Sequence, residues 1–514
     1  MLIPKERRHG RRPRLILNEI SYARLGEAVA RFASALNELG LQEGDRIALI
    51  SNPRASWAIS LFAALYCGTV VVPLDPELQQ GEIERILLEA DVSAAVTSGK
   101  MVKKLVKIKE SSLPGLTLIS MDRPQEAGVK FLDAMLLNRT PLAPTQVAPD
   151  NLAILMYTSG TTGNAKGAML THANISSNVL ATARLVSLSS ADTLLSIVPW
   201  YHIYGLTITL ITPIYVGATA TFSPVDRNLL QVLRKARPTI ILGVPKLYNV
   251  LYTRIRQSIE SSTVKRSLDR LAPQLMGRLV TRRLFGKRFR FFTSGGAPLA
   301  PEIAAGFRRM GIGIMEGYGL TETSPLLTMC PAFTSEPGMT PIEGVEVKIT
   351  QPNEDGIGEV LVRGPNVMRG YYKNERATNE VIDADGWFHT GDLGSLAGKR
   401  LTLSGRAKNV IVLETGKNVY PEEVEWKLVT IPEIEEIMIY EGKRQGAPAV
   451  AAMIYPNWTL LKEQGINAPQ PALELIWGKI KECDQALALF KRIKHKELVT
   501  FMDEPFQKSV KLDI

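Results

Sequence analysis

Short apolar segments alternate with longer amphipathic segments through the first 300 residues of the chain. The apolar segments are rich in β-branched and aromatic residues, and glycine or proline lies at or near the end of each. They lie at residues 46–51, 69–74, 153–160, 239–245 and 289–296. Between them apolar residues recur at helical spacing, as at 22–40. Continuous apolar strands between helices are typical of parallel sheets covered on both faces, so this pattern predicts an α/β fold.

The pattern changes at about residue 340. Residues 340–405 contain closely spaced strand-like segments, such as GVEVKIT and GEVLVRG, which predict a small antiparallel sheet or β-barrel-like part. Residues 406–514 carry strand-like segments among helical ones, which predicts an α+β unit. A chain of 514 residues is too long for one core. We therefore expect a large N-terminal domain, 1–405, with two parallel-type sheets flanked by helices, and a smaller C-terminal α+β domain, 406–514.

The composition, 45% hydrophobic and 22% charged, is ordinary for a soluble globular protein. Cys67, Cys330 and Cys483 lie far apart, which argues against a disulfide framework or a zinc site. Two long uncharged segments, 57–74 and 193–225, are interrupted by proline and polar residues, so we interpret them as buried helix-plus-strand segments rather than membrane spans. The start of the chain lacks the apolar core of a signal peptide. These features predict a cytoplasmic protein.

The net charge is +10, and residues 407–514 contribute −2 of it, so the excess of basic residues lies earlier. Six basic residues lie at 5–14 and eleven at 254–290. The second stretch has leucines at 268, 271, 275 and 279, a spacing that predicts an amphipathic helix. Such a helix could dock on anionic membrane or receive an acidic protein, and the alternative is a solvated helix with a core stripe. No motif supports nucleic-acid binding.

The segment YTSGTTGNAKG, residues 157–167, places glycines, hydroxyl residues and one lysine directly after a strand-like segment. Backbone amides at such a turn, with hydroxyl and ammonium groups, suit a polyphosphate. The spacing does not match a Walker A loop, in which glycine precedes the lysine and Ser or Thr follows it. The residues predicted to bind phosphate are Thr158, Ser159, Gly160, Thr161, Thr162, Gly163 and Lys166.

Six further motifs follow along the chain: PWYHIYGL (199–206), TSGGAPL (293–299), EGYGLTET (316–323), GEVLVRGPNVMRGYY (358–372), DGWFHTGDLG (385–394) and SGRAKNVIVLETGKNVYPEEVE (404–425). Together with the loop they resemble the adenylate-forming (AMP-binding) superfamily, although Ala165 stands where proline is usual. GVPKLYNVLYTRI (243–255) and the Thr415-Gly416 pair look most like bacterial long-chain fatty acyl-CoA synthetases.

The resemblance implies an ATP site. Glu322 and Thr162 would hold Mg²⁺, a hard cation that prefers oxygen ligands. Thr321 would contact the α-phosphate, and His202 would lie beside the acyl carboxylate. Asp392 and Arg406 would bind the ribose. The residues that would border the adenine are Gly295, Gly296, Ala297, Glu316, Gly317, Tyr318 and Gly319.

The resemblance also assigns the C-terminal part a catalytic lysine and a hinge. Lys408 occupies the hinge position, where the family usually has Asp or Lys. The tail resembles the family pattern P-x-T-x-x-G-K, which places the lysine at Lys511, with Lys508 as a nearby competitor. Val510 replaces the usual glycine, and the chain ends three residues after Lys511, earlier than the resemblance leads us to expect.

The reaction implied by this resemblance has two steps. ATP activates a fatty acid to acyl-AMP with release of pyrophosphate, and the thiol of CoA then takes the acyl group. The alternatives left open are acyl carrier protein as the acceptor and an aryl or medium-chain acid as the substrate. A nonribosomal-peptide adenylation domain would be expected to continue into a carrier domain. The acyl chain length and the oligomeric state do not follow from the sequence.

Overall fold

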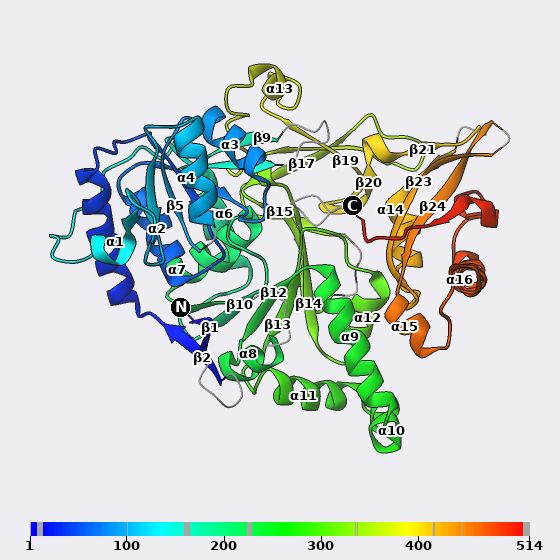
Figure 1. Cartoon of the computed structure of the whole chain (residues 1–514). Coiled ribbons are helices and arrows are strands. Elements are labelled where there is room, and N and C mark those ends of the chain that lie inside the picture. Colours follow the sequence, from blue (N-terminus) through cyan, green and yellow to red (C-terminus); the bar gives the residue numbers. More distant parts are fainter. Residues whose placement is uncertain are drawn as a thin grey trace.

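The computed structural model describes residues 2–7, 14–99, 101–158, 165–223, 229–334, 336, 338–414, 417–444 and 446–506 (Figure 1). It contains two large β-sheets, a small antiparallel sheet and a C-terminal α+β unit. In Figure 1 the blue and cyan elements lie at one end of the molecule and the orange and red C-terminal elements at the other. The predicted α/β class, with two mainly parallel sheets and a smaller C-terminal part, is confirmed.

The first large sheet has seven strands. Their order is β7 (Lys130–Phe131), β6 (Thr117–Ser120), β5 (Val92–Thr97), β3 (Arg46–Ile50), β4 (Val70–Leu74), β8 (Leu152–Thr158) and β9 (Lys166–Thr171). The strands pair in parallel except β9, which is antiparallel to β8. A short helix, α5 (Leu132–Met135), follows β7.

Helices cover both faces of this sheet. Ile47 and Leu49 of β3 pack in one core with α1 (Tyr22–Glu38) and α2 (Ala55–Tyr66). Ala48 and Ile50 pack in another with α3 (Gln80–Glu89) and α4 (Met101–Ser111). Successive strand residues point to opposite faces, so burial of both faces requires a continuous apolar run. The strands predicted at 46–51, 69–74 and 153–160 are confirmed for this reason.

The second large sheet has nine strands. Their order is β16 (Thr340–Pro341), β15 (Leu326–Cys330), β14 (Gly313–Gly319), β13 (Phe291–Ser294), β12 (Ile240–Gly243), β10 (Thr193–Ser196), β11 (Thr219–Phe222), β1 (Leu2–Arg7) and β2 (Arg14–Glu19). Neighbouring strands from β11 to β14 pair in parallel, whereas β14 with β15 and β15 with β16 pair antiparallel.

Helices cover both faces of this second sheet. One face carries α6 (His172–Leu185), the π-helix η1 (Gly205–Ile211) and α7 (Thr212–Val216). The other face carries α8 (Leu229–Ala236), α9 (Pro245–Glu260), α11 (Pro273–Leu284) and α12 (Pro301–Arg309).

The prediction of one amphipathic helix over 254–290 is wrong. The segment contains the end of α9, then α10 (Thr263–Leu271), then α11. Ala272 has φ −145° and ψ 67°, and Pro273 is the first residue of α11. Proline disfavours the helical conformation for the residue before it and is well suited to the first turn of a new helix. The leucine spacing therefore continues across two helices.

The remaining chain forms the small sheet and the C-terminal unit. The antiparallel strands β17 (Glu346–Thr350), β18 (Gly358–Arg363), β19 (Phe388–Ala397) and β20 (Arg400–Arg406) form one four-stranded sheet, and α13 (Glu375–Asn379) lies between β18 and β19 in the chain. The C-terminal unit contains β21 (Ile411–Val412), β22 (Asn418–Val419), α14 (Pro421–Leu428), β23 (Ile434–Arg444), β24 (Ala447–Pro456), α15 (Trp458–Glu463), α16 (Pro469–Cys483) and β25 (Val499–Phe501), and it has its own apolar core. The division into two domains at residues 405 and 406 stays a prediction.

Among the described residues, no helix combines the length and apolar character needed to cross a bilayer.

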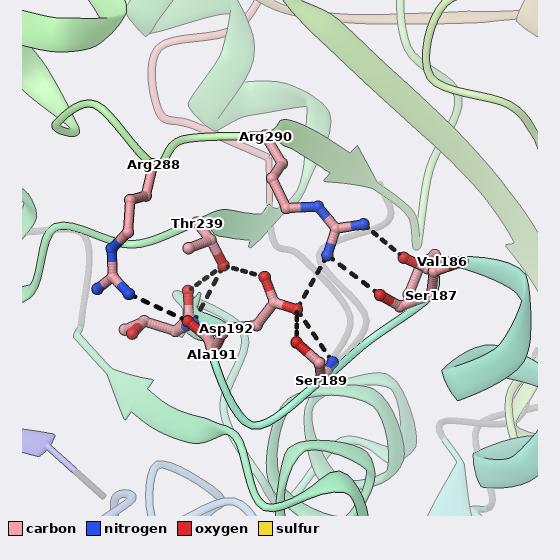
Figure 2. Close-up of polar contacts among 9 residues, drawn as sticks. Val186, Ser187, Ser189, Ala191, Asp192, Thr239, Arg288 and Arg290 are labelled. Carbon is pink, nitrogen blue, oxygen red and sulfur yellow. Dashed lines mark hydrogen bonds and ion pairs between the residues drawn. The ribbon is translucent and has the colours of Figure 1, made fainter.

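A buried ionic cluster joins the amino ends of three strands in the second sheet (Figure 2). The carboxylate of Asp192, just before β10, accepts hydrogen bonds from Arg290 Nη1 at 2.9 Å and from the hydroxyl of Thr239 at 2.8 Å. Arg290 Nη2 also donates to the carbonyl oxygen of Val186, 2.7 Å away. Thr239 precedes β12 and Arg290 precedes β13, so one buried carboxylate holds these strands in register.

Burial by itself would raise the pKa of Asp192. The hydrogen bonds from Thr239 and Arg290 outweigh this effect and hold the pKa of the carboxyl below its usual range. A depressed pKa in the folded state stabilises the protein above the unfolded-state pKa of about 3.9. This stabilisation is lost as the pH falls below that value through the folded-state pKa.

We predict that Asp192→Ala lowers the free energy of unfolding by about 3 kcal/mol, because Arg290 is then left without its carboxylate. Urea denaturation at neutral pH measures the change. The difference between wild type and variant should shrink as the pH is lowered below about 4. Arg288→Ala is the control, because Arg288 donates to the carbonyl oxygen of Ala191 at an exposed position, and its loss should cost less than about 1 kcal/mol. Equal effects of the two variants would contradict the assigned role.

Candidate functional site

A cavity of about 850 Å³ lies where β12, β13 and β14 end. Ligands of open α/β sheets bind at the carboxyl ends of the strands, and the glycine-rich segments that follow these strands line this cavity. Ten of the predicted site residues line it: Thr158, His202, Gly295, Gly296, Ala297, Gly317, Tyr318, Gly319, Thr321 and Arg406. The structure therefore brings together most of the motifs that the sequence placed far apart.

The turn after β14 is held in place from two directions. Asn178 of α6 and Asn366 both donate from their side-chain amides to the carbonyl oxygens of Thr323 and Leu326, at 2.8–3.2 Å. A Cβ atom at Gly319 would lie 1.8 Å from the carbonyl oxygen of Pro325, so this close approach of two backbone segments requires glycine. The turn directs Thr321 into the cavity lining.

Glu322, in the same turn, is buried and meets Tyr371. The hydroxyl of Tyr371 donates to Glu322 Oε1 at 2.9 Å. Burial and the neighbouring carboxylate raise the pKa of Tyr371, so the phenol stays protonated and remains a donor. The ammonium group of Lys166, at the start of β9, lies 5.0 Å from the centre of the Tyr371 ring. Tyr371 thus links the carboxylate predicted to hold Mg²⁺ with the lysine predicted to bind phosphate.

Asp392 and Arg406 form an ion pair next to Tyr318. Arg406 Nε lies 2.8 Å from Asp392 Oδ1, and the hydroxyl of Tyr318 donates to Asp392 Oδ2 at 2.6 Å. Asp392 and Arg406 lie directly opposite each other on the antiparallel strands β19 and β20. This pairing explains how two residues 14 positions apart in the sequence meet. Burial and the Asp392 charge raise the pKa of Tyr318 well above its usual value. The tyrosine and the arginine both reach the cavity.

His202 lies on the cavity wall, in contact with the ring of Tyr201 at 4.8 Å between ring centres. It precedes η1, where Gly205 is required because a Cβ atom there would lie 2.1 Å from the carbonyl oxygen of Pro199. Much of the remaining lining is apolar and includes Ile208 of η1. It reaches Leu194, Ile240 and Phe291, at or near the amino ends of β10, β12 and β13, so the apolar part runs along the whole of these short strands.

Several predicted residues lie elsewhere. Glu316 is on β14 but faces Arg308, 3.8 Å away, and is not part of the cavity wall. Lys408 is exposed in a short 3-10 turn, Ala407–Asn409, between β20 and β21. The predicted residues at positions 159–163, including Thr162, lie outside the described residues, as do Lys508 and Lys511. Within the described part of the chain, no three His, Cys, Asp or Glu side chains gather as a metal cluster.

Sequence reasoning missed the residues that support this site. Tyr371 lies in the motif RGYY, which belongs to the family resemblance but does not by itself indicate a contact with Glu322. Asn178 lies in an ordinary helix, and nothing in its sequence context indicates that its amide reaches a turn almost 150 residues further along the chain. For Tyr371, its place in a family motif was a signal that it could belong to the site. For Asn178, the sequence contains no such signal.

Comparison with known protein families shows that residues 5–372 match the family described as "AMP-binding enzyme". This covers most of the chain, and the chain belongs to that family. The motifs around the cavity are therefore those of an AMP-binding enzyme.

Two curated relatives and one solved structure illustrate the similarity. Long chain acyl-CoA synthetase 6, peroxisomal, of Arabidopsis thaliana is 32% identical over 452 residues, which are 79% of this chain and 64% of the plant protein. Long-chain-fatty-acid--CoA ligase FadD15 of Mycobacterium bovis is 30% identical over 478 residues, 85% of this chain and 77% of the relative. This chain thus spans slightly less than two thirds of the length of the plant relative. ATP-bound MatB from Rhodopseudomonas palustris is 26% identical, with a TM-score of 0.75 over 97% of this chain and 92% of that one.

We predict that Tyr371→Phe raises the Mg²⁺ concentration needed for half-maximal ATP binding about tenfold, because Glu322 loses the donor that orients it. Calorimetric titration of the protein with ATP over a series of Mg²⁺ concentrations measures this change. Tyr372→Phe is the matched control, since the neighbouring hydroxyl reaches Asp91 at an exposed position instead. An unchanged Mg²⁺ requirement in Tyr371→Phe would show that Glu322 does not bind the metal through this arrangement.

Proposed function

We propose that this protein activates a fatty acid with ATP, forming acyl-AMP and pyrophosphate, and then transfers the acyl group to CoA. The observation that carries the proposal is the continuity of the cavity. The glycines at 295 and 296, Tyr318 and Thr321 line its polar part, and an apolar wall continues beyond His202. The names of the plant and mycobacterial relatives support the same substrate class.

The first step needs positioning and charge neutralisation. A carboxylate is a poor acyl donor because its leaving group would be oxide, whereas AMP is a far better one. Thr321 would orient the α-phosphate, and Lys511 would neutralise charge between that phosphate and the attacking carboxylate. Residues 159–163 and Lys166 would hold the two phosphates that leave. Mg²⁺, when bound at Glu322 and Thr162, supplies further neutralisation of phosphate charge.

The second step needs the catalytic lysine to leave so that a thiol can enter. We propose a swing of the C-terminal domain about Lys408, as the family resemblance implies. In the arrangement described here, Lys427 of α14 pairs with Glu302 of α12 at 2.7 Å, and Lys246 of α9 lies 4.0 Å from Glu436 of β23. The Lys427–Glu302 pair is partly exposed on both sides, so its loss costs little free energy and is compatible with such a motion. In the other contact Lys246 is exposed, whereas Glu436 is buried.

The apolar wall supports a fatty acid as the substrate. The apolar lining follows β12 through Ile240 and Leu242, and a strand of four residues is roughly 13 Å long at about 3.3 Å per residue. Buried methylenes contribute about 0.8 kcal/mol each, so a longer acyl chain gains binding until the wall ends. CoA is the proposed acceptor. Acyl carrier protein, or an aryl or medium-chain acid, is the alternative that the experiment below distinguishes.

The test is a pyrophosphate-release screen with saturated acids from acetate to stearate and with aryl acids, each with CoA or acyl carrier protein. We expect kcat/KM to rise about fourfold per added methylene, which corresponds to about 0.8 kcal/mol, up to a limiting length. CoA should support thioester formation. No release with any fatty acid would overturn the proposal, and a maximum with an aryl acid or with carrier protein would replace it by the corresponding alternative.

The two half-reactions should respond oppositely to two substitutions. Lys511→Ala should abolish acyl-AMP formation and retain thioester formation from supplied acyl-AMP. Lys408→Pro should spare acyl-AMP formation and block the thioester step, because proline fixes the backbone dihedral that must change. Each half-reaction is measured separately by pyrophosphate exchange and by thioester assay.

Two conservative controls accompany this pair. Lys508→Ala removes the nearby competing lysine and should leave both steps active. Lys408→Ala keeps the backbone free and should do the same. Equal loss of both half-reactions in either test variant would contradict the assigned roles of Lys511 and Lys408.

A further inference from the structure

The helices α10 and α11 present an apolar row to the outside of the molecule. Four aliphatic side chains on them are strongly exposed: Val264 by 77%, Leu271 by 86%, Leu275 by 47% and Leu279 by 49%. Leu271 follows Val264 by seven residues and Leu279 follows Leu275 by four, so each pair lies on one face of its helix. Isolated exposed leucines need no explanation, but a row of four on adjacent helices marks an interaction surface.

This exposure is a fixed property of the fold. Asp269 of α10 is buried, and its carboxylate pairs with Arg256 of α9 at 2.7 Å and with Arg309 of α12 at 2.9 Å. On α11, Gly277 packs so closely that a Cβ atom would lie 1.9 Å from the carbonyl oxygen of Met310. Because these contacts hold the inner faces of both helices against α9 and the end of α12, the aliphatic row must point outward.

Positive charge surrounds the row. Arg278 and Arg282 lie three residues after Leu275 and Leu279, on the same side of α11, and Arg270 and Arg283 are also exposed. None of these four arginines forms an ion pair with a residue in the described part of the chain. Between 263 and 290 the only acidic residue is Asp269, which is buried in its own ion pairs. The surface therefore combines aliphatic side chains with uncompensated positive charge.

We propose that the exposed face of α10 and α11 is a docking surface for an anionic lipid bilayer. Leucine side chains would enter the boundary of the acyl chains, while arginines keep their guanidinium groups at the anionic headgroups. An acidic protein would have to supply a matching apolar surface as well as its carboxylates, whereas a bilayer of anionic lipids supplies both. A second copy of this chain would bring its own arginines against these, at an electrostatic cost.

The position of the surface relates it to the cavity. The cavity lining reaches α9 at Lys246, Val250 and Arg254, which recur every four residues on one side of that helix. α10 and α11 follow α9 directly, and Figure 1 shows them at the edge of the molecule beyond its end. An acid that resides in the bilayer could pass from this surface to the cavity. This link to the substrate rests on the proposed function, whereas the lipid-binding surface does not.

The experiment measures binding to vesicles of phosphatidylcholine alone and of phosphatidylcholine with phosphatidylglycerol, by cosedimentation without ATP or fatty acid. The protein should bind the anionic vesicles, release them as salt is raised, and bind the neutral ones much more weakly. The variant Arg278→Gln/Arg282→Gln/Arg283→Gln should lose about fivefold in affinity per arginine, or on the order of a hundredfold in all. The variant Leu271→Ser/Leu275→Ser/Leu279→Ser should lose roughly tenfold or more.

Matched controls lie on other surfaces. Lys103→Gln/Lys107→Gln removes exposed charges from α4, and Leu137→Ser/Leu489→Ser removes two exposed leucines at 65% and 72% exposure. Both should bind vesicles like wild type. All variants should keep wild-type activity on a detergent-solubilised acid, so that failure of the proposed function is seen separately from failure of lipid binding.

Three outcomes would overturn the proposal. One is no binding to anionic vesicles, and another is wild-type binding by both surface variants. The third is evidence for a different occupant. Sedimentation velocity could show a dimer that the leucine variant no longer forms. Alternatively, the arginine variant could lose acyl transfer to acyl carrier protein while it still binds vesicles.

Discussion

The segment from Tyr318 to Leu326 sets the geometry on which the rest of the site depends, because three side chains leave it in different directions. Tyr318 reaches the Asp392–Arg406 pair, Thr321 enters the cavity wall and Glu322 meets Tyr371. The backbone can follow this path only because Gly319 has no Cβ and because two buried amides satisfy the carbonyl oxygens of the turn. A different path for this turn would separate all three contacts at once.

The buried carboxylates at the two ends of the second sheet have different hydrogen-bond partners. Asp192 lies at the amino ends of the strands, where an arginine and a threonine satisfy it and the cluster serves stability. Glu322 and Asp392 lie near the carboxyl ends, and each accepts a hydrogen bond from a tyrosine. A neutral phenol orients a carboxylate without cancelling its charge, which suits Glu322 to a cation. Carboxylates therefore hold the sheet together at one end, and at the other end they are held in place by tyrosine hydroxyls.

Much of the fold could be predicted because parallel strands with both faces buried must be apolar throughout, and the segments at 46–51 and 239–245 are confirmed on that basis. The prediction of one amphipathic helix failed at Pro273, because the regular leucine spacing continues across the break between α10 and α11. The membership of the AMP-binding family follows from motifs whose order along the chain is itself informative. The roles of Lys408 and Lys511 remain predictions.

The sequence by itself determined the α/β class, the family and most of the residues around the cavity, since local patterns and short motifs record which residues a strand or a phosphate-binding turn requires. Only the tertiary structure decided which of them meet. Tyr371 finds Glu322, and Asn178 reaches Leu326, through contacts between segments 49 and 148 residues apart. The outward face of α11 was likewise settled by close packing of Gly277 on Met310. Long-range contacts of this kind depend on how whole elements pack, and the spacing of residues within one element carries no information about that.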